Sequence, residues 1–156
     1  MIVLNQVLVA SDFSPPSDAA LIYGRALARS FGATLHVLHV VENFFLRATP
    51  SNPHTMLESK THTLNELVSD DDRTTLRAVT AINVNDSPAA AITDYARAKA
   101  IDLIIMGTHG RGTVSQLLVG SVAERVVRTA PCPVLTVRHP EHDFVVPDSS
   151  EQARQS

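Results

Sequence analysis

The sequence is poor in the residues that build disulfides and aromatic stacking surfaces. Its 156 residues include one cysteine, no tryptophan, two tyrosines and five phenylalanines. A disulfide needs two cysteines, so none can form within the chain, and this favours a reducing compartment such as the cytoplasm. Scarce aromatic side chains leave few platforms on which the bases of a single-stranded nucleic acid stack. Single-strand-binding proteins are therefore a disfavoured class.

The sequence also lacks runs of basic residues and long apolar stretches. Its formal net charge of −3 comes from residues 139–156, which hold four acidic residues and one arginine, while the rest is neutral. Without a basic face, we expect no nucleic-acid partner. No apolar run approaches the ~20 residues of a membrane helix, so we expect no membrane partner. The first ten residues lack the basic lead and cleavage site of a signal peptide, which again predicts a cytoplasmic location.

What is present is the composition of an ordinary globular domain. Hydrophobic residues make up 44% of the chain and charged residues 19%, which is enough apolar material for one core. Residues 140–156 are polar, acidic and contain two prolines. We expect one domain over residues 1–139, followed by a disordered acidic tail over 140–156.

Strand and helix patterns alternate along the chain. β-rich apolar runs predict strands over 3–10, 34–41, 76–84, 101–106 and 133–138. Apolar residues at helical spacing predict helices over 14–31, 55–69, 88–100 and 121–129. Residues 42–53 are interpreted as an irregular loop and residues 70–72 as a charged turn. The alternation predicts an α/β fold: an open five-stranded parallel sheet with helices on both faces.

Candidate ligand residues follow several of these strands. Asp12 comes after the first strand, Val40 lies near the end of the second, and Gly107 follows the fourth. Ligands of open α/β sheets bind beyond the carboxyl ends of the strands, where the strand order reverses. The three positions are therefore expected to converge on one crevice. Asp12 is equally well placed to cap the helix that follows it.

Four glycines mark the segment after the fourth strand. Met106 ends the apolar run, and Gly107, Gly110, Gly112 and then Gly120 follow, the last beside Ser121 at the start of a helical pattern. Glycines let the backbone approach an anion, and the unpaired N–H groups of a helix start point at it. The segment predicts a phosphate-binding loop, and hence a nucleotide-binding protein.

Side chains within this segment extend the prediction. Arg111 is a candidate partner for a terminal phosphate, and the Ser121 hydroxyl is a candidate ligand for a Mg²⁺ carried by the nucleotide. No Gly-Lys-Ser/Thr occurs, so the loop is not a Walker A sequence. The first strand is not followed by GxGxxG, which disfavours dinucleotide binding of the common kind.

The spacing Gly107-x2-Gly110-x9-Gly120-Ser121 resembles the nucleotide-binding signature of the universal stress protein family. The segments VLVASDFSPPSDAAL, LHVV, MGTHGRG, LLVGS and APCPVLTVR resemble the same family in order, over about residues 3–138, whereas residues 43–75 hold no family marker. The resemblance implies a Rossmann-like fold of the adenine nucleotide alpha hydrolase-like type, in the ATP-binding branch of the family. It also implies a homodimer through the fifth strand, whose position at the sheet edge suits such pairing.

The resemblance further implies a role for each matching residue. Asp12 meets the ribose or adenine side of the nucleotide, and the Val40 backbone contacts adenine. Gly107 and Gly110 shape the loop, and Gly120, Ser121 and Val122 present N–H groups, with a hydroxyl from Ser121, to the phosphates. Beside these, Met106 and Arg111 are predicted binding residues from their places at the strand end and in the loop.

Two functions remain open at this point. The first is an ATP-binding regulatory protein of the stress response, whose ATP, ADP or AMP state alters binding to an unknown protein partner. The alternative is a slow ATPase or a nucleotidyl-transferring enzyme of the same adenine-binding superfamily. Only Asp12, His109 and Arg111 are candidates for catalytic work, and no carboxylate pair stands near the loop, which favours binding over fast turnover.

The histidines and the cysteine do not form a recognisable metal motif. His36 and His39 lie three apart on a predicted strand, so their side chains are expected on opposite faces. Without a Cys pair, HxxxH or HExxH, we expect no zinc site. Cys132, between two prolines, is interpreted as a small packing residue.

Overall fold

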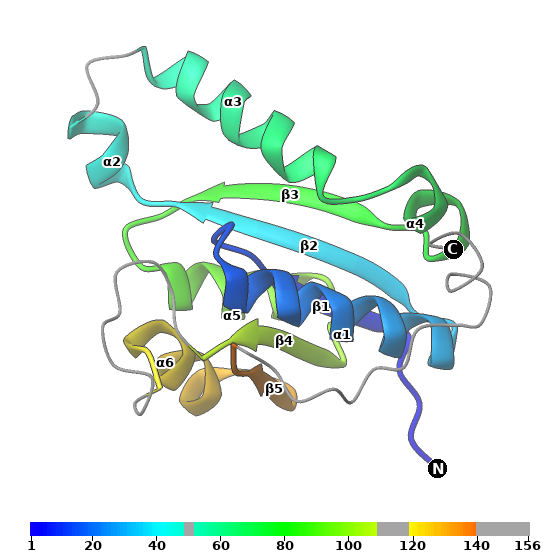
Figure 1. The fold of residues 1–156 in the computed structure, drawn as a ribbon. Helices are drawn as coiled ribbons and strands as arrows, with labels where there is room; N and C mark the ends of the chain where they lie inside the picture. The colour runs from blue at the N-terminus through cyan, green and yellow to red at the C-terminus, as the bar shows by residue number, and fades with distance from the viewer. Residues whose placement is uncertain (49–51, 109–118, 140–156) are drawn as a thin grey trace.

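A five-stranded parallel β-sheet lies between two layers of helices (Figure 1). The computed structural model describes residues 1–48, 52–108 and 119–139. The strands are β1 (Gln6–Ala10), β2 (Thr34–Val41), β3 (Val79–Val84), β4 (Leu103–Gly107) and β5 (Val134–Val137). The helices are α1 (Pro15–Phe31), α2 (Asn43–Ala48), α3 (Pro53–Glu66), α4 (Asp70–Thr75), α5 (Pro88–Ala98) and α6 (Ser121–Thr129). None of the helices in these ranges is long and apolar enough to cross a bilayer.

The strand order β3-β2-β1-β4-β5 places a switch point in the middle of the sheet. From β1 the chain winds outward through β2 to β3, then returns to the other side of β1 with β4 and β5. Ala10 pairs with Leu38 of β2 and with Met106 of β4, so three strand ends lie side by side. The predicted α/β fold is confirmed, and its ligand-binding crevice is expected beyond β1 and β4. β5 is an edge strand, as predicted.

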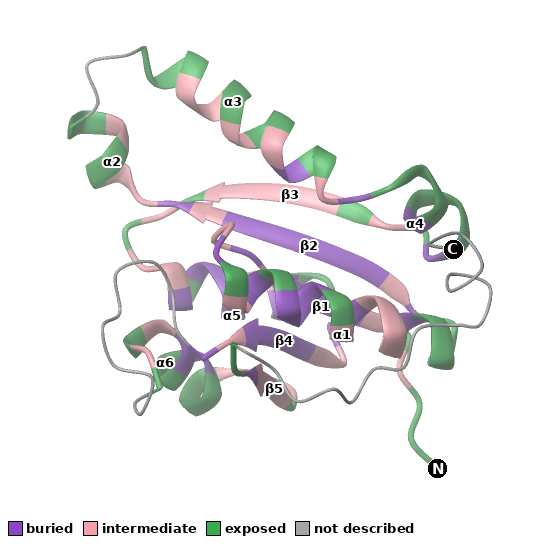
Figure 2. Ribbon diagram, viewed as in Figure 1, coloured by how far each residue is buried: buried purple, intermediate pink, exposed green. Residues whose placement is uncertain are grey.

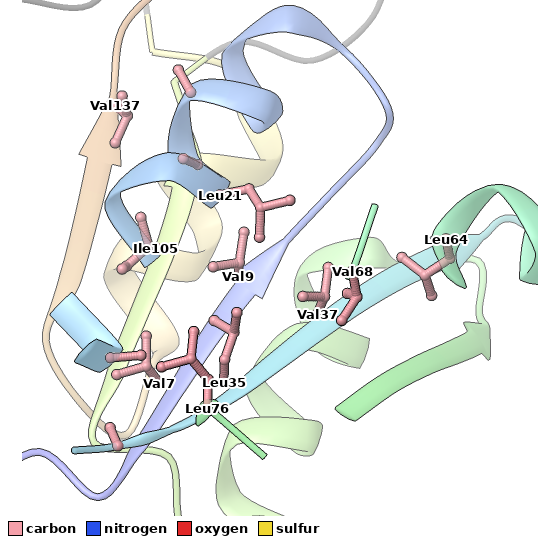
Figure 3. Packing of buried hydrophobic residues seen from close by; sticks show 14 residues of the cluster. Val7, Val9, Leu21, Leu35, Val37, Leu64, Val68, Leu76, Ile105 and Val137 are labelled. Carbon is pink, nitrogen blue, oxygen red and sulfur yellow. The ribbon is translucent and has the colours of Figure 1, made fainter. Parts of the chain in front are cut away.

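The two faces of the sheet carry separate cores. On one face, α1 packs across β1 and β4, and the connection through α3 packs beside β3. Figure 3 shows Leu21 beside Val9 and Ile105 on this face, with Leu64 and Val68 reaching toward Val37. The other face is covered by α5 and α6. Buried residues run along β1, β2 and β4, whereas edge strand β3 is mostly half-buried (Figure 2).

Helix α1 approaches the sheet closely because of a glycine. A Cβ at Gly24 would lie 2.3 Å from Val9 Cγ2, so a larger residue would require the Val9 side chain or the helix to shift. The helix ends at Gly32, whose φ of 67° lies in the left-handed region that suits glycine. Both residues fix the position of α1, whose first turn borders the strand ends.

Two of the connections differ from the predictions. The loop predicted over 42–53 contains the short helix α2, and α3 begins at Pro53, behind the side-chain cap of Asn52. The charged turn predicted over 70–72 is the first turn of α4, where Ser69 and Asp72 form a capping box. Consecutive acidic residues resembled a solvated turn, but acidic residues also stabilise a helix N-terminus.

Three of the predicted strands begin two or three residues later in the structure than the sequence pattern indicated. Arg77 adopts a φ of 51°, which interrupts the segment predicted as strand over 76–84, so that β3 begins at Val79. Ala100 has a φ of 49° and separates α5 from β4, which begins at Leu103 instead of at residue 101. β1 begins at Gln6, where its register with β2 starts, and Asn5 before it bonds to β2 only through its carbonyl, which accepts from Thr34 N–H at 2.8 Å.

Candidate functional site

A cavity of about 610 Å³ lies over the carboxyl ends of β1, β2 and β4. Seven of the nine predicted binding residues line it: Asp12, Val40, Met106, Gly107, Gly120, Ser121 and Val122. The other two, Gly110 and Arg111, lie outside the described residues, as does His109. Residues up to 110 positions apart in sequence therefore border one cavity, at the switch point of the sheet. Their roles in binding remain predictions.

The turn between β1 and α1 holds Asp12 in a defined position. The Asp12 Oδ1 atom accepts hydrogen bonds from the Ser14 N–H, at 3.1 Å, and from the Ser14 hydroxyl. Phe13 has a φ of 64°, a strained conformation for a bulky residue, and its N–H donates to the Ser11 hydroxyl at 3.2 Å. Asp12 thus forms a turn with Ser14 ahead of α1 and does not cap the helix as predicted, because Ser14 is the N-cap residue and no side-chain cap bond is made there. Asp12 also lines the cavity.

Gly107 permits close contact between the end of β4 and the first turn of α1. A Cβ at Gly107 would lie 2.7 Å from Pro16 Cβ and 2.9 Å from the Pro16 backbone carbon. Backbone atoms cannot move away from an added Cβ as the end of a flexible side chain can. Gly107 therefore has a packing role that the phosphate-loop interpretation missed, and it also lines the cavity.

We expect Gly107→Ala to lower the free energy of unfolding by about 1–3 kcal/mol, because the added methyl overpacks against Pro16. Urea denaturation of both proteins measures this difference. An unchanged urea midpoint would mean that β4 and α1 can move apart to admit the methyl group without loss of stability. A matched control is Ala98→Gly at the last residue of α5, which removes a methyl from an exposed site and is expected to change stability by less than about 1 kcal/mol.

The amino end of α6 faces the cavity. Gly120 is the N-cap residue, and its N–H donates to the Thr108 carbonyl at 2.5 Å, while Thr108 N–H donates to the Val137 carbonyl at 2.9 Å. Among the described residues, no side chain caps this helix. Ser121 and Val122, in the first turn, line the cavity. Because first-turn N–H groups have no partner within a helix, this end presents donors and a positive partial charge to an anion.

Sequence comparison places the chain among known proteins. A profile described as the universal stress protein family matches residues 4–138, which is the whole described domain apart from its ends. The chain belongs to this family. The family predicted from the glycine spacing and the flanking segments is thereby confirmed.

Two relatives show how much of the universal stress protein domain the similarity covers. A universal stress protein of Methanocaldococcus jannaschii is 28% identical over 150 residues, covering 89% of this chain and 85% of the relative. One from Thermus aquaticus is 34% identical over 140 residues, covering 85% of this chain and 97% of the relative. The shared length therefore includes the segments before and after the cavity.

Solved structures of universal stress proteins have the same fold. One, in complex with cAMP, superimposes with a TM-score of 0.66 at 22% identity, over 88% of this chain and 98% of its own. Another, from Archaeoglobus fulgidus in complex with dAMP, has a TM-score of 0.62 at 24% identity, over 87% and 98% of the two chains. At these identities the likeness shows the fold.

The cavity has a second wall that sequence reasoning missed. It comes from the end of β2 and from α2 and α3, and its members share no motif: His39, Glu42, Phe45, Met56 and Lys60. These residues fall largely in the stretch 43–75, where no family marker occurs. His39 and Glu42 belong to the end of β2, and α2 carries Phe45 directly after it. The packing of α3 beside the sheet brings Met56 and Lys60 to the strand ends, and no local signal predicts these two.

His39 connects this wall to the Asp12 turn. The buried His39 ring donates a hydrogen bond from Nδ1 to the Ser11 carbonyl at 2.8 Å and lies against the Phe13 ring, with centroids 4.2 Å apart. His36 lies on the opposite face of β2, where Nε2–H donates to Gln6 Oε1 at 2.7 Å and Nδ1 accepts from the Tyr95 hydroxyl at 2.8 Å. Burial, and then the Lys99 charge, lower the pKa of His36, so it is a neutral packing residue.

Metal-binding groups do not gather at the cavity in the part of the chain that the structure describes. No set of three or more His, Cys, Asp or Glu side chains with metal-binding geometry occurs there. Cys132 is half-buried against the α5–α6 core, and burial raises the pKa of its thiol. A raised pKa keeps the thiol protonated and a poor nucleophile.

Proposed function

We propose that this universal stress protein binds an adenine nucleotide, ATP or its products ADP and AMP, in the cavity at the strand ends. The observation that carries the proposal is the convergence of seven predicted binding residues on one cavity. Solved family members in complex with cAMP and dAMP support an adenine nucleotide as the ligand class.

The proposed roles follow from the position of each element. Asp12 meets the ribose or adenine, and the backbone of Val40, at the end of β2, contacts adenine. Donors from the first turn of α6, at Ser121 and Val122, bind the phosphates, and the Ser121 hydroxyl helps to hold a nucleotide-bound Mg²⁺. Gly110 and Arg111 complete the proposed phosphate loop.

The nucleotide is proposed to act as a signal. In this proposal the protein is a homodimer paired through edge strand β5, and its nucleotide state changes the binding of a regulatory partner. Val134 and Leu135 on β5 are half-buried within one chain, so pairing with a second copy would cover more of their surface. Sedimentation velocity with and without ATP tests the dimer.

Two measurements test the proposed ligand and role. Mass spectrometry of the denatured purified protein is expected to detect an adenine nucleotide, and calorimetry of the stripped protein to show binding of ATP but not of CTP. Binding to neither ATP, ADP nor AMP at about 1 mM would contradict the proposal. Turnover of ATP above ~1 per second, an ordinary enzyme rate, would favour the enzymatic alternative; Asp12→Ala serves as its control.

A further inference from the structure

The second wall of the cavity brings a positive charge to the site. Lys60 lies on α3, one turn beyond Met56, and both side chains line the cavity. Among the described lining residues, Lys60 is the only lysine or arginine, whereas Asp12 and Glu42 contribute carboxylates. The glycine-loop signature does not include this residue.

Lys60 is held beside the Asp12 turn. Its Nζ atom lies 5.4 Å from the centroid of the Phe13 ring, within the range of a cation–π interaction. The Phe13 ring in turn packs on His39, which is bonded to the Ser11 carbonyl. Since Phe13 directly follows Asp12, this chain of contacts holds the ammonium group at the Asp12 turn, on the edge of the cavity.

The ammonium group has no ion pair in the structure's described ranges. Lys60 as a whole residue is half-buried at the cavity, where a charge is screened less by water than it is on an open surface. A cavity lined by two carboxylates repels a polyphosphate unless cations offset them. The α6 amino end supplies part of that positive potential, and Lys60 supplies a full charge.

We propose that Lys60 is a binding residue for the phosphate group of the nucleotide, acting from the second wall of the cavity. This inference rests on the proposed adenine-nucleotide binding and adds a second source of positive charge to it. Lys60 then distinguishes nucleotides from nucleosides, since its contact exists only when the ligand carries phosphate.

Calorimetry with ATP and adenosine tests the inference. Lys60→Met, which keeps the apolar stem and removes the charge, is expected to weaken ATP binding about tenfold while adenosine affinity stays within about twofold. Lys60→Arg is expected to restore most of the ATP affinity. The matched control is Lys99→Met: Lys99 is the other lysine of the chain and lies exposed at the end of α5.

Salt provides a second readout. ATP affinity of the wild-type protein is expected to fall more steeply between low and high salt than that of Lys60→Met, because a charge contact is lost to screening. Equal loss of ATP and adenosine affinity would assign Lys60 to packing and overturn the inference, as would unchanged ATP affinity. Wild-type protein that binds neither ligand would overturn the proposed function and this inference together.

Discussion

Gly120→Val is expected to abolish nucleotide binding while the fold is retained. Gly120 has a φ of −63° and a ψ of 155°, an extended conformation that valine adopts readily. The valine side chain would stand beside the first-turn donors of α6, where Gly120 and Ser121 line the cavity. We expect a loss of at least ~100-fold in ATP affinity, equivalent to about 2.7 kcal/mol.

Calorimetry measures this loss, and thermal unfolding without ligand shows whether the variant is folded. Gly120→Ala adds one methyl at the same place and is expected to give an intermediate loss, since less of the anion's space is filled. A folded Gly120→Val protein with wild-type affinity would remove the start of α6 from the binding site.

Asp72→Ala is expected to lower the free energy of unfolding by about 3 kcal/mol. Asp72 is 1% exposed, and its Oδ2 atom accepts from Arg25 Nε at 2.9 Å and from the Ser69 N–H at 3.1 Å. The same guanidinium of Arg25 donates to the Leu67 carbonyl. Removing the carboxylate opens the capping box of α4 and leaves Arg25 of α1 without its acidic partner.

Urea denaturation measures this effect, and Asp71→Asn is the matched control. Asp71 lies one residue earlier on α4 and bonds to Arg29 at 3.0 Å, but its side chain is 65% exposed. Its replacement is expected to change stability by no more than about 0.5 kcal/mol. If both variants lose similar free energy of unfolding, the burial of Asp72 adds nothing to its contribution to stability.

Asp72 also predicts how stability depends on pH. Burial alone would raise the pKa of its carboxyl, but hydrogen bonds from Ser69 and Arg25 and the Arg25 charge together lower the pKa below its ordinary value. The stabilisation is therefore present above about pH 4 and is lost as pH falls through the lowered pKa. Between neutral and acid pH, Asp72→Ala is expected to lose less stability than the wild-type protein does.

The contrast between Asp12 and Asp72 shows what local patterns reveal. Asp12 stands at the end of a clear apolar strand, so its place at the carboxyl edge follows from the strand–helix alternation. Asp72 lies in a run of three acidic residues, which resembled a solvated turn. Its burial depends on Arg25, 47 positions away, and no local pattern reports a partner at that distance.

The two walls of the cavity differ in the same way. Met106, Gly107, Gly120 and Ser121 flank one connection between a strand and a helix, so spacing along the chain sufficed to predict them together. Phe45 and Lys60 come from helices in a segment without a motif. They reach the cavity because α2 follows β2 at the strand end and α3 packs back along β3.

The sequence by itself determined the alternation of strands and helices, the family and the residues at the strand ends. It did so because strand burial, helix periodicity and glycine conformation are properties of short segments. Tertiary structure alone decided the contact of Gly107 with Pro16, the burial of Asp72 and the place of Lys60. Each depends on the packing of α1, α3 or α4, which is set by side chains distant in the chain.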